Sequence, residues 1–180
     1  MAQENPSNPR PDNVGRKWRS NTLSEYFADR GHIVTRWRSS FSHQKKIYLS
    51  TESLREKHDN YYHQFIKARA YKKHISISRI LSHYDLGVNF TKIAEFSEKP
   101  DFVHLANVPI ELAYSVSKYC YKYKIPYIVD IRDLWPDIYL DLIPKYLSKF
   151  KPIVYQLLRL IYEKKIFFIF NNATGLTALT

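Results

Sequence analysis

The sequence has few of the residues that mark common classes of site. It contains one cysteine, Cys120, so no intramolecular disulfide can form. Its four glycines are scattered, and none belongs to a GxGxxG or Walker-type phosphate loop. No window of about 18 uncharged apolar residues occurs, so no transmembrane helix is predicted. The start of the chain does not join a basic segment to an apolar core, so no signal peptide is predicted either.

Residues for metal binding or nucleophilic catalysis are also scarce in any useful pattern. The seven histidines show no spacing typical of a metal site, and there is no CxxC pair or serine-hydrolase elbow. We therefore expect no bound metal and no resident cofactor. Cys120 lies in a predicted helix, where a buried thiol is more typical than a nucleophile.

Cations and aromatic residues are abundant. The chain has 180 residues, 44% of them hydrophobic, which suits one domain with a substantial core. Its net charge is +11, and it contains 15 tyrosines and 3 tryptophans. Such a balance points to an anionic partner: nucleic acid, a membrane surface or a phosphorylated ligand. The sequence shows no nucleic-acid-binding motif, and the basic residues are not concentrated on one predicted helix.

Apolar runs and turn residues predict alternating helices and strands after an irregular segment over residues 1–15. This order indicates an α/β fold with a Rossmann-like, mainly parallel sheet and helices on both faces, over residues 16–180. The segment 102–131 reads as a strand–helix–strand unit, which is parallel by default. Helices are expected at 16–30, 78–90, 110–123 and 152–168, and strands at 33–37, 65–71, 102–105 and 127–131.

The most informative stretch is residues 125–137, where a nearly continuous apolar strand ends in Arg132 and Asp133. Ligands of open α/β sheets bind outside the carboxyl ends of the strands, so these two residues are candidates to face a ligand. The alternative is that they pair with each other or cap the next helix. His104 lies inside another predicted strand, where a core histidine is the commoner outcome.

Three segments, taken together, resemble one family. Residues 129–137 (VDIRDLWPD) resemble the strand–loop junction in the N-terminal domain of family 4 glycosyltransferases with the GT-B fold, closest to enzymes of bacterial surface polysaccharide synthesis. Residues 30–43 (RGHIVTRWRSSFSH) and 100–109 (PDFVHLANVP) are similar to two further segments of that domain, in the same order and spacing. Residues 173–179 resemble its last strand.

The resemblance implies transfer of a sugar from a nucleotide-diphosphate sugar to a lipid-linked or saccharide acceptor, with retention and without a metal. Asp133 would orient an acceptor hydroxyl, and Arg132 would bind a phosphate or a carboxylate. Many members of the family have histidine where this chain has Arg132. Because arginine cannot act as a base at neutral pH, a proton-shuttle role is not expected at this position.

Further substrate contacts follow from position in the family's pattern. Gly15 would let the backbone approach the ligand, Arg16 and Lys17 would meet phosphate charge, and His104 would contribute to substrate or phosphate binding. The alternative for residues 13–17 is a solvated basic turn before a helix. The implied location is cytoplasmic, with peripheral contact at the inner face of the plasma membrane.

The sequence departs from the family in two places. The first, central strand of the sheet is missing from the start, and the C-terminal domain that binds the donor sugar does not follow residue 180. We therefore expect the chain to correspond to a fragment that is not catalytic alone. The alternative function is a non-catalytic basic protein that binds nucleic acid or anionic membrane, to which the basic, aromatic zone 51–85 and the helix 152–168 would contribute. That helix is predicted to pack its apolar stripe in the core; the other interpretation lays it on an anionic bilayer.

Overall fold

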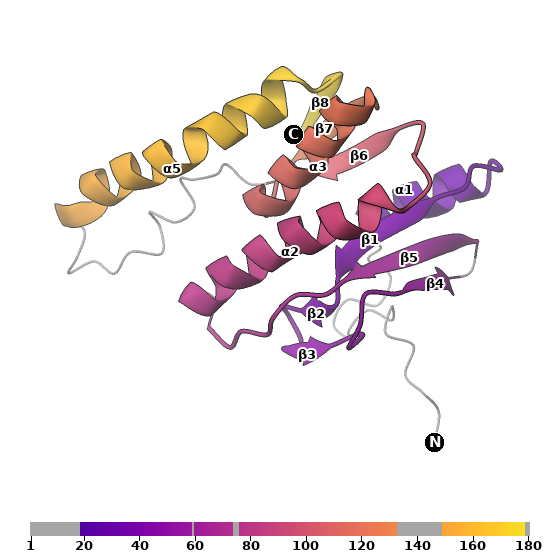
Figure 1. Ribbon diagram of the computed structural model, residues 1–180, viewed down its shortest axis with the longest axis horizontal. Coiled ribbons are helices and arrows are strands. Elements are labelled where there is room, and N and C mark those ends of the chain that lie inside the picture. The colour runs from indigo at the N-terminus through magenta and orange to yellow at the C-terminus, as the bar shows by residue number, and fades with distance from the viewer. Residues whose placement is uncertain (1–18, 59, 74–75, 133–148, 179–180) are drawn as a thin grey trace. The chain divides into compact units, whose positions relative to one another are not determined.

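The computed structural model describes residues 19–58, 60–73, 76–132 and 149–178, and its contacts divide the chain into two units, Met1–Ala70 and Tyr71–Thr180 (Figure 1). The first unit holds α1 (Arg19–Ala28), β1 (Thr35–Ser39), β2 (Phe41–Ser42), β3 (Ile47–Tyr48), β4 (Arg55–His58) and β5 (Tyr61–Ile66). The second holds α2 (Ile77–Glu95), β6 (Val103–Ala106), α3 (Ile110–Tyr123), β7 (Tyr127–Ile131), α5 (Lys151–Asn171) and β8 (Gly175–Ala178).

The first unit is built on the sheet β1-β5-β4. β5 lies in the middle, parallel to β1 and antiparallel to β4, and the short strands β2 and β3 form a separate antiparallel pair. Tyr61, Phe65 and Ile66 on β5 are buried, as a central strand requires. Gly31 follows α1 with a φ of +85°, a conformation that glycine adopts without strain, so the predicted stop after the first helix is confirmed.

The second unit is a parallel sheet of three strands in the order β6-β7-β8. α3 connects β6 to β7, and α5 precedes β8. The phenol of Tyr127 on β7 donates a hydrogen bond of 2.7 Å to the carbonyl oxygen of Ile169 on α5, and the same ring lies near Cys120 on α3. Both helices therefore lie on the face of the sheet that carries Tyr127. The α/β class and the parallel pairing predicted for residues 102–131 are confirmed.

The described strands form two three-stranded sheets and one short pair of strands instead of one continuous sheet. Within the described residues, β1 pairs only with β5, and β6 pairs only with β7. Each of these two strands is therefore an edge of its own sheet. The GT-B arrangement expected from the resemblance stays a prediction.

Two predicted features of the elements are wrong. The strand expected at 65–71 lies earlier, at Tyr61–Ile66. The strand β4 was not predicted, because its sequence, REKH, has no apolar residue: Arg55, Glu56 and Lys57 are all exposed.

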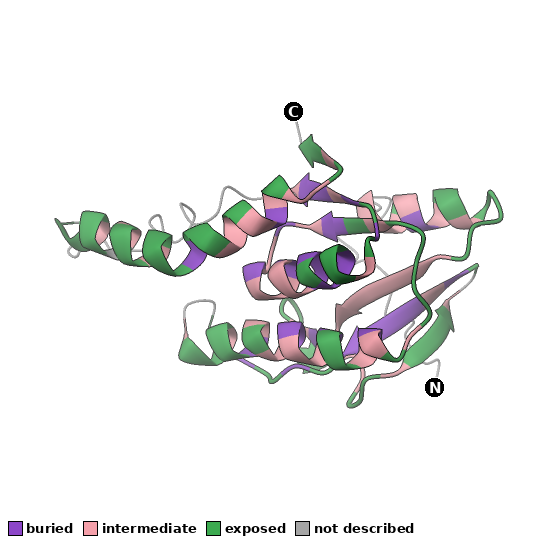
Figure 2. Ribbon diagram, turned by 45° about the horizontal axis from the view of Figure 1, so that its top comes forward, coloured by how far each residue is buried: buried purple, intermediate pink, exposed green. Residues whose placement is uncertain are grey.

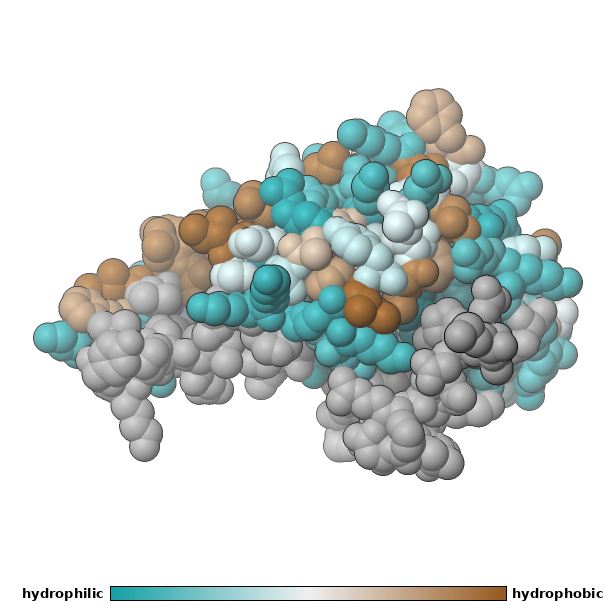
Figure 3. Space-filling model, turned by 90° about the horizontal axis from the view of Figure 1, so that it is seen from below, coloured by the Kyte–Doolittle hydropathy of each residue, from teal (hydrophilic) through white to brown (hydrophobic). Residues whose placement is uncertain are grey.

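The apolar stripe expected to pack in the core from α5 is largely at the surface. Ile153, Leu157 and Ile161 are 66%, 57% and 50% exposed, whereas the buried side chains of this helix include Tyr162 and Ile169. Figure 2 shows the N-terminal half of α5 mostly exposed, and Figure 3 shows hydrophobic side chains along the left of the view, where this helix extends. α5 is apolar on more than one face, and only one of them meets α3 and the sheet.

Candidate functional site

Asp130 organises the carboxyl end of the parallel sheet. It is the fourth residue of β7, and none of its surface is exposed. Its Oδ1 accepts a hydrogen bond of 3.1 Å from the hydroxyl of Thr177 on β8, and its Oδ2 accepts one of 2.9 Å from Nε of Arg132. A buried carboxylate is stable only when it is paired and hydrogen-bonded, so these two donors stabilise the charge of Asp130. The carboxylate in turn orients the side chains of Thr177 and Arg132.

Asn107 ties the end of β6 to the same cluster. Its side-chain oxygen accepts a hydrogen bond of 3.0 Å from the backbone N–H of Arg132. The backbone N–H of Asn107 donates one of 3.1 Å to the backbone carbonyl of Asp130. Asn107 is 6% exposed, so these contacts are shielded from water. Asn107, Asp130 and Thr177 thus connect the ends of all three strands, and Arg132 leaves the sheet from a fixed backbone position.

The guanidinium of Arg132 is held on one side only. Nε is occupied by Asp130, whereas the two Nη groups have no hydrogen-bond partner among the described residues. The side chain is 38% exposed, so these groups can be reached from solvent. A guanidinium fixed through Nε offers two N–H groups in one plane, and this fork matches the oxygens of a phosphate or carboxylate.

The start of α3 lies at the same end of the sheet. Pro109 is its N-cap and provides no side-chain hydrogen bond, and Asn107 is only two residues before it. The first backbone N–H groups of a helix have no partners within the helix, and they favour negative charge. Arg132 and the first turn of α3 therefore both favour an anion beyond the ends of β6 and β7.

Of the six predicted site residues, the structure describes Arg132 and His104. Arg132 lies at the end of β7 as expected, and its partner among the described residues is Asp130. Asp133, Gly15, Arg16 and Lys17 lie outside the described residues.

His104 is exposed on β6, so the interpretation as a core histidine is wrong. It pairs in register with Ile128, two residues before the pair formed by Ala106 and Asp130. Since residues two apart in a strand face the same side, His104 shares the face of Asp130 at about 7 Å along the strand. It is placed where it can contribute to a ligand that also contacts Arg132.

The sequence reading missed Asn107 and Thr177 as site residues. Asn107 could have been found, because it lies in the short loop between a predicted strand and the helix that follows it. Thr177 could not, since its contact with Asp130 depends on the register of two strands that are 47 residues apart in sequence. Register is set by packing of the whole sheet and is not readable from one strand.

Cys120 does not provide a nucleophile. It is fully buried on α3, and burial raises the pKa of its thiol to about 12. The reactive thiolate is therefore absent at neutral pH. This agrees with the prediction of a buried structural thiol.

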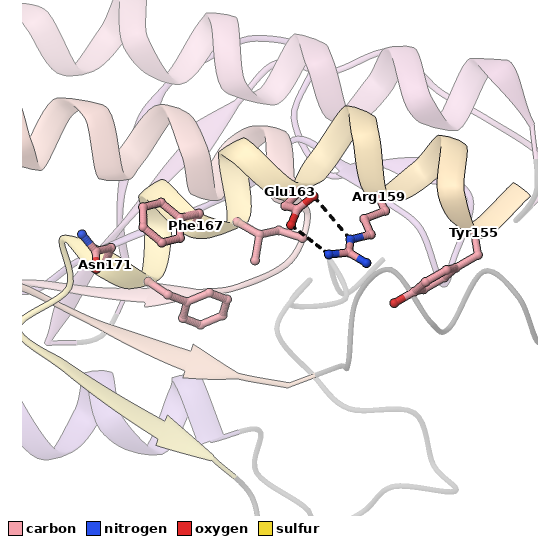
Figure 4. A pocket seen from close by; sticks show the side chains of 7 residues that line it. Tyr155, Arg159, Glu163, Phe167 and Asn171 are labelled. Carbon is pink, nitrogen blue, oxygen red and sulfur yellow. Dashed lines mark hydrogen bonds and ion pairs between the residues drawn. The ribbon is translucent and has the colours of Figure 1, made fainter.

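A shallow hollow runs along α5, away from the cluster of Asp130. Tyr155, Arg159, Glu163 and Phe167 line it, and the guanidinium of Arg159 makes two hydrogen bonds of 3.3 Å to the carboxylate of Glu163 (Figure 4). The charged groups at its floor satisfy each other, which leaves no free charge for a ligand. Neither Asp130 nor Arg132 lines this hollow.

Among the described residues, no group of three or more His, Cys, Asp or Glu side chains is arranged to hold a metal ion. In the same part of the chain, no helix has the length and hydropathy needed to cross a membrane.

Comparison of the chain with protein-family models, with curated proteins and with solved structures found no match. Its function is therefore inferred from the residues themselves and from their geometry.

Proposed function

We propose that this chain is the acceptor-side part of a GT-B glycosyltransferase of the family 4 type. The complete enzyme would transfer a sugar from a nucleotide-diphosphate sugar to a lipid-linked or saccharide acceptor in surface polysaccharide synthesis. One observation carries the proposal: the guanidinium of Arg132 is anchored through Nε by buried Asp130 at the carboxyl end of a parallel sheet, the side chain is 38% exposed, and its Nη groups have no hydrogen-bond partner among the described residues.

The position of this guanidinium supports a role in binding substrate. Parallel α/β sheets bind ligands outside the carboxyl ends of their strands, which is where Arg132 stands. A buried carboxylate is costly to maintain, and Asp130 is fully buried while the arginine that it orients stays partly exposed. A purely structural ion pair would not require the exposed half of the guanidinium to remain unpaired.

The proposed chemistry assigns positioning, not proton transfer, to this part of the enzyme. Arg132 would bind a phosphate of the acceptor or of the leaving diphosphate, where its fixed charge stabilises the negative charge that develops in transfer. Arg132 cannot remove a proton from the acceptor hydroxyl. By resemblance, Asp133 would orient that hydroxyl, and a second domain would bind the donor nucleotide.

Binding of the acceptor tests the proposal. The purified chain is titrated with a polyprenyl-diphosphate-linked sugar in detergent micelles, and heats of binding are recorded for the wild type and for Arg132→Gln. We expect the variant to bind roughly 10- to 100-fold more weakly, because it loses a charge-assisted hydrogen-bonding fork.

The matched control is Lys118→Gln, which removes the same charge from an exposed position on α3. It should leave acceptor binding unchanged. Equal losses in the two variants would mean that the acceptor responds only to net charge. Absence of binding by the wild type would refute an acceptor-side role.

A second observation favours contact with an anionic membrane. On α5, several large apolar side chains are at least half exposed and recur at helical spacing along one side: Ile153, Leu157, Leu160, Ile161 and Phe167. Lys164 is exposed on the same side of the helix, and Lys149 is exposed just before the helix begins. An exposed apolar helix face with lysines suits the interface of an anionic bilayer, where each cation contributes about 1 kcal/mol.

Vesicle sedimentation tests this contact. Leu157→Glu should reduce binding of the chain to vesicles that contain phosphatidylglycerol, because it places a negative charge within the apolar face. Ile77→Glu is the control, since Ile77 is 77% exposed on α2. If both variants bind as well as the wild type, α5 does not face the membrane.

A further inference from the structure

One face of the sheet β1-β5-β4 gathers polar and cationic side chains. Arg36 and Arg38 on β1 pair in register with His63 and Phe65 on β5. Residues that pair across strands share a face, and residues two apart in a strand do as well. Arg36, Arg38, His63 and Phe65 therefore lie on one side of the sheet, together with Tyr61 at the start of β5.

His63 is buried there without a hydrogen bond. It is 5% exposed, and neither of its ring nitrogens has a hydrogen-bond partner among the residues that the structure describes. Within the same residues the hydroxyl of Tyr61 has no partner either, and this residue is 1% exposed. The two rings are close, with centroids 5.3 Å apart. Buried polar atoms of native proteins almost always have partners, so unsatisfied groups side by side indicate a water, an ion or a ligand.

Arg38 adds a cation to the same face. Among the described residues it forms no hydrogen bond or ion pair, and its guanidinium lies 5.6 Å from the centre of the Phe65 ring. Burial lowers its pKa, and the neighbouring charge of Arg36 lowers it further. Glu56 pairs in register with His63 from β4, but it is exposed and makes no ion pair with Arg38.

Arg36 directs its guanidinium toward α1. One Nη group donates a hydrogen bond of 2.8 Å to the hydroxyl of Ser20, and the other donates to the side-chain oxygen of Asn21. Both acceptors are neutral, so these contacts orient the arginine without cancelling its charge. The face thus combines the guanidinium of Arg38 with the buried ring nitrogens of His63, and Arg36 lies beside them.

We infer that this face of β1 and β5 binds a phosphate group, with Arg38 as the main ligand and His63 as a second hydrogen-bonding group. A guanidinium binds phosphate through two parallel N–H groups. The site lies in the first unit, separate from the cluster at Arg132, and does not depend on the function proposed for that cluster.

His63 adds a neutral hydrogen-bonding group to this face. Burial lowers its pKa to about 3, and the charges of Arg38, Arg36 and His58 act in the same direction, so the ring is neutral at pH 7. A neutral imidazole has one nitrogen that donates and one that accepts, and the two point in nearly opposite directions. A phosphate held by Arg38 would therefore meet one ring nitrogen of His63, and it would accept a hydrogen bond there in the tautomer that places the proton on that nitrogen.

Titration calorimetry of the whole chain with inorganic phosphate tests the inference, at constant ionic strength in chloride. The experiment uses Arg132→Gln as the background, so that phosphate bound at the other cluster does not contribute. We expect saturable binding, and Arg38→Gln in this background should weaken it roughly 10- to 100-fold. Lys57→Gln is the matched control, because Lys57 is exposed and pairs with Tyr62, on the opposite face of the same sheet.

A spectroscopic measurement does not depend on any variant folding. Phosphate should move the imidazole nitrogen resonances of His63 in the ¹⁵N-labelled chain, whereas an equal concentration of chloride should not. The inference is overturned if these resonances stay in place. It is also overturned if Arg38→Gln and Lys57→Gln weaken binding equally, since the heat would then report net charge and not this site.

Discussion

Gly87 lies where α2 packs closely against α3, and the effect of replacing it with alanine can be worked out from the contacts there. A methyl group built at this position would lie 2.7 Å from Oγ of Ser115 and 2.8 Å from the carbonyl oxygen of Glu111, both on α3. Ordinary contacts of such a carbon begin at 3.4 Å. The Ser115 side chain can rotate away, but the backbone oxygen of Glu111 cannot. The two helices must therefore move apart by several tenths of an ångström.

Two opposing effects set the size of the change. Alanine favours a helix over glycine by about 1 kcal/mol. Overpacking of a well-packed interface costs about 1–3 kcal/mol, and here the clash with backbone places the cost in the upper half of that range. Gly87→Ala should therefore lower the free energy of unfolding by about 1–2 kcal/mol. For a chain of this length, that loss lowers the melting temperature by about 2–8 °C.

Urea unfolding followed by circular dichroism measures the effect. The double variant with Ser115→Ala should recover only part of the loss, because the contact with the Glu111 oxygen remains. Ser115→Ala alone is the control. If Gly87→Ala is as stable as the wild type or more so, the expected clash with the backbone of α3 is absent, and the close approach of α2 and α3 is refuted.

Three further predictions concern single buried groups. Tyr127→Phe leaves the carbonyl of Ile169 without its 2.7 Å hydrogen bond, so the free energy of unfolding in urea should fall by about 1–3 kcal/mol; an unchanged value would contradict that bond. Burial lowers the pKa of His63 to about 3, so between pH 6.5 and 3 the unfolded chain binds a proton that the folded chain does not. The contribution of neutral His63 to the free energy of unfolding should therefore be fully present above pH 6.5 and be lost as the pH falls toward 3, by at most about 1.4 kcal/mol per pH unit. In urea titrations at several pH values, His63→Phe should reduce this dependence on pH. An identical dependence in the variant and the wild type would exclude the effect. Asp130→Asn should lower the free energy of unfolding of the wild type by about 1 kcal/mol, and it should lower that of the Arg132→Gln variant by less, because the ion pair is already lost there. If the two effects add in a double-mutant cycle, the two side chains are not coupled.

Elements with local start and stop signals could be predicted from the sequence. Pro109 marks the start of α3 and Gly31 the end of α1, and the apolar run of β7 identifies a strand buried by its neighbours. These signals act within a few residues, so they do not require the rest of the fold.

Elements without such signals were misplaced. β5 buries Tyr61, His63 and Phe65 on one face, and a histidine in this pattern obscures the alternation that would locate the strand. β4 carries only charged residues and histidine, and it is a strand because β5 provides the hydrogen bonds. Tertiary pairing decides both, and periodicity does not reveal it.

The same distinction explains why the sequence indicated Arg132 but not how it is held. A charged residue directly after an apolar strand is visible in one segment of the chain. Its anchor, Asp130, looks like part of the strand, and its burial is tolerated only because Thr177 donates a hydrogen bond from a neighbouring strand and Asn107 fixes the backbone. Asparagine in place of Asp130 would accept more weakly, and the open side of Arg132 would then be less well fixed. The anion-binding property therefore belongs to the register of three strands, and the arginine alone does not determine it.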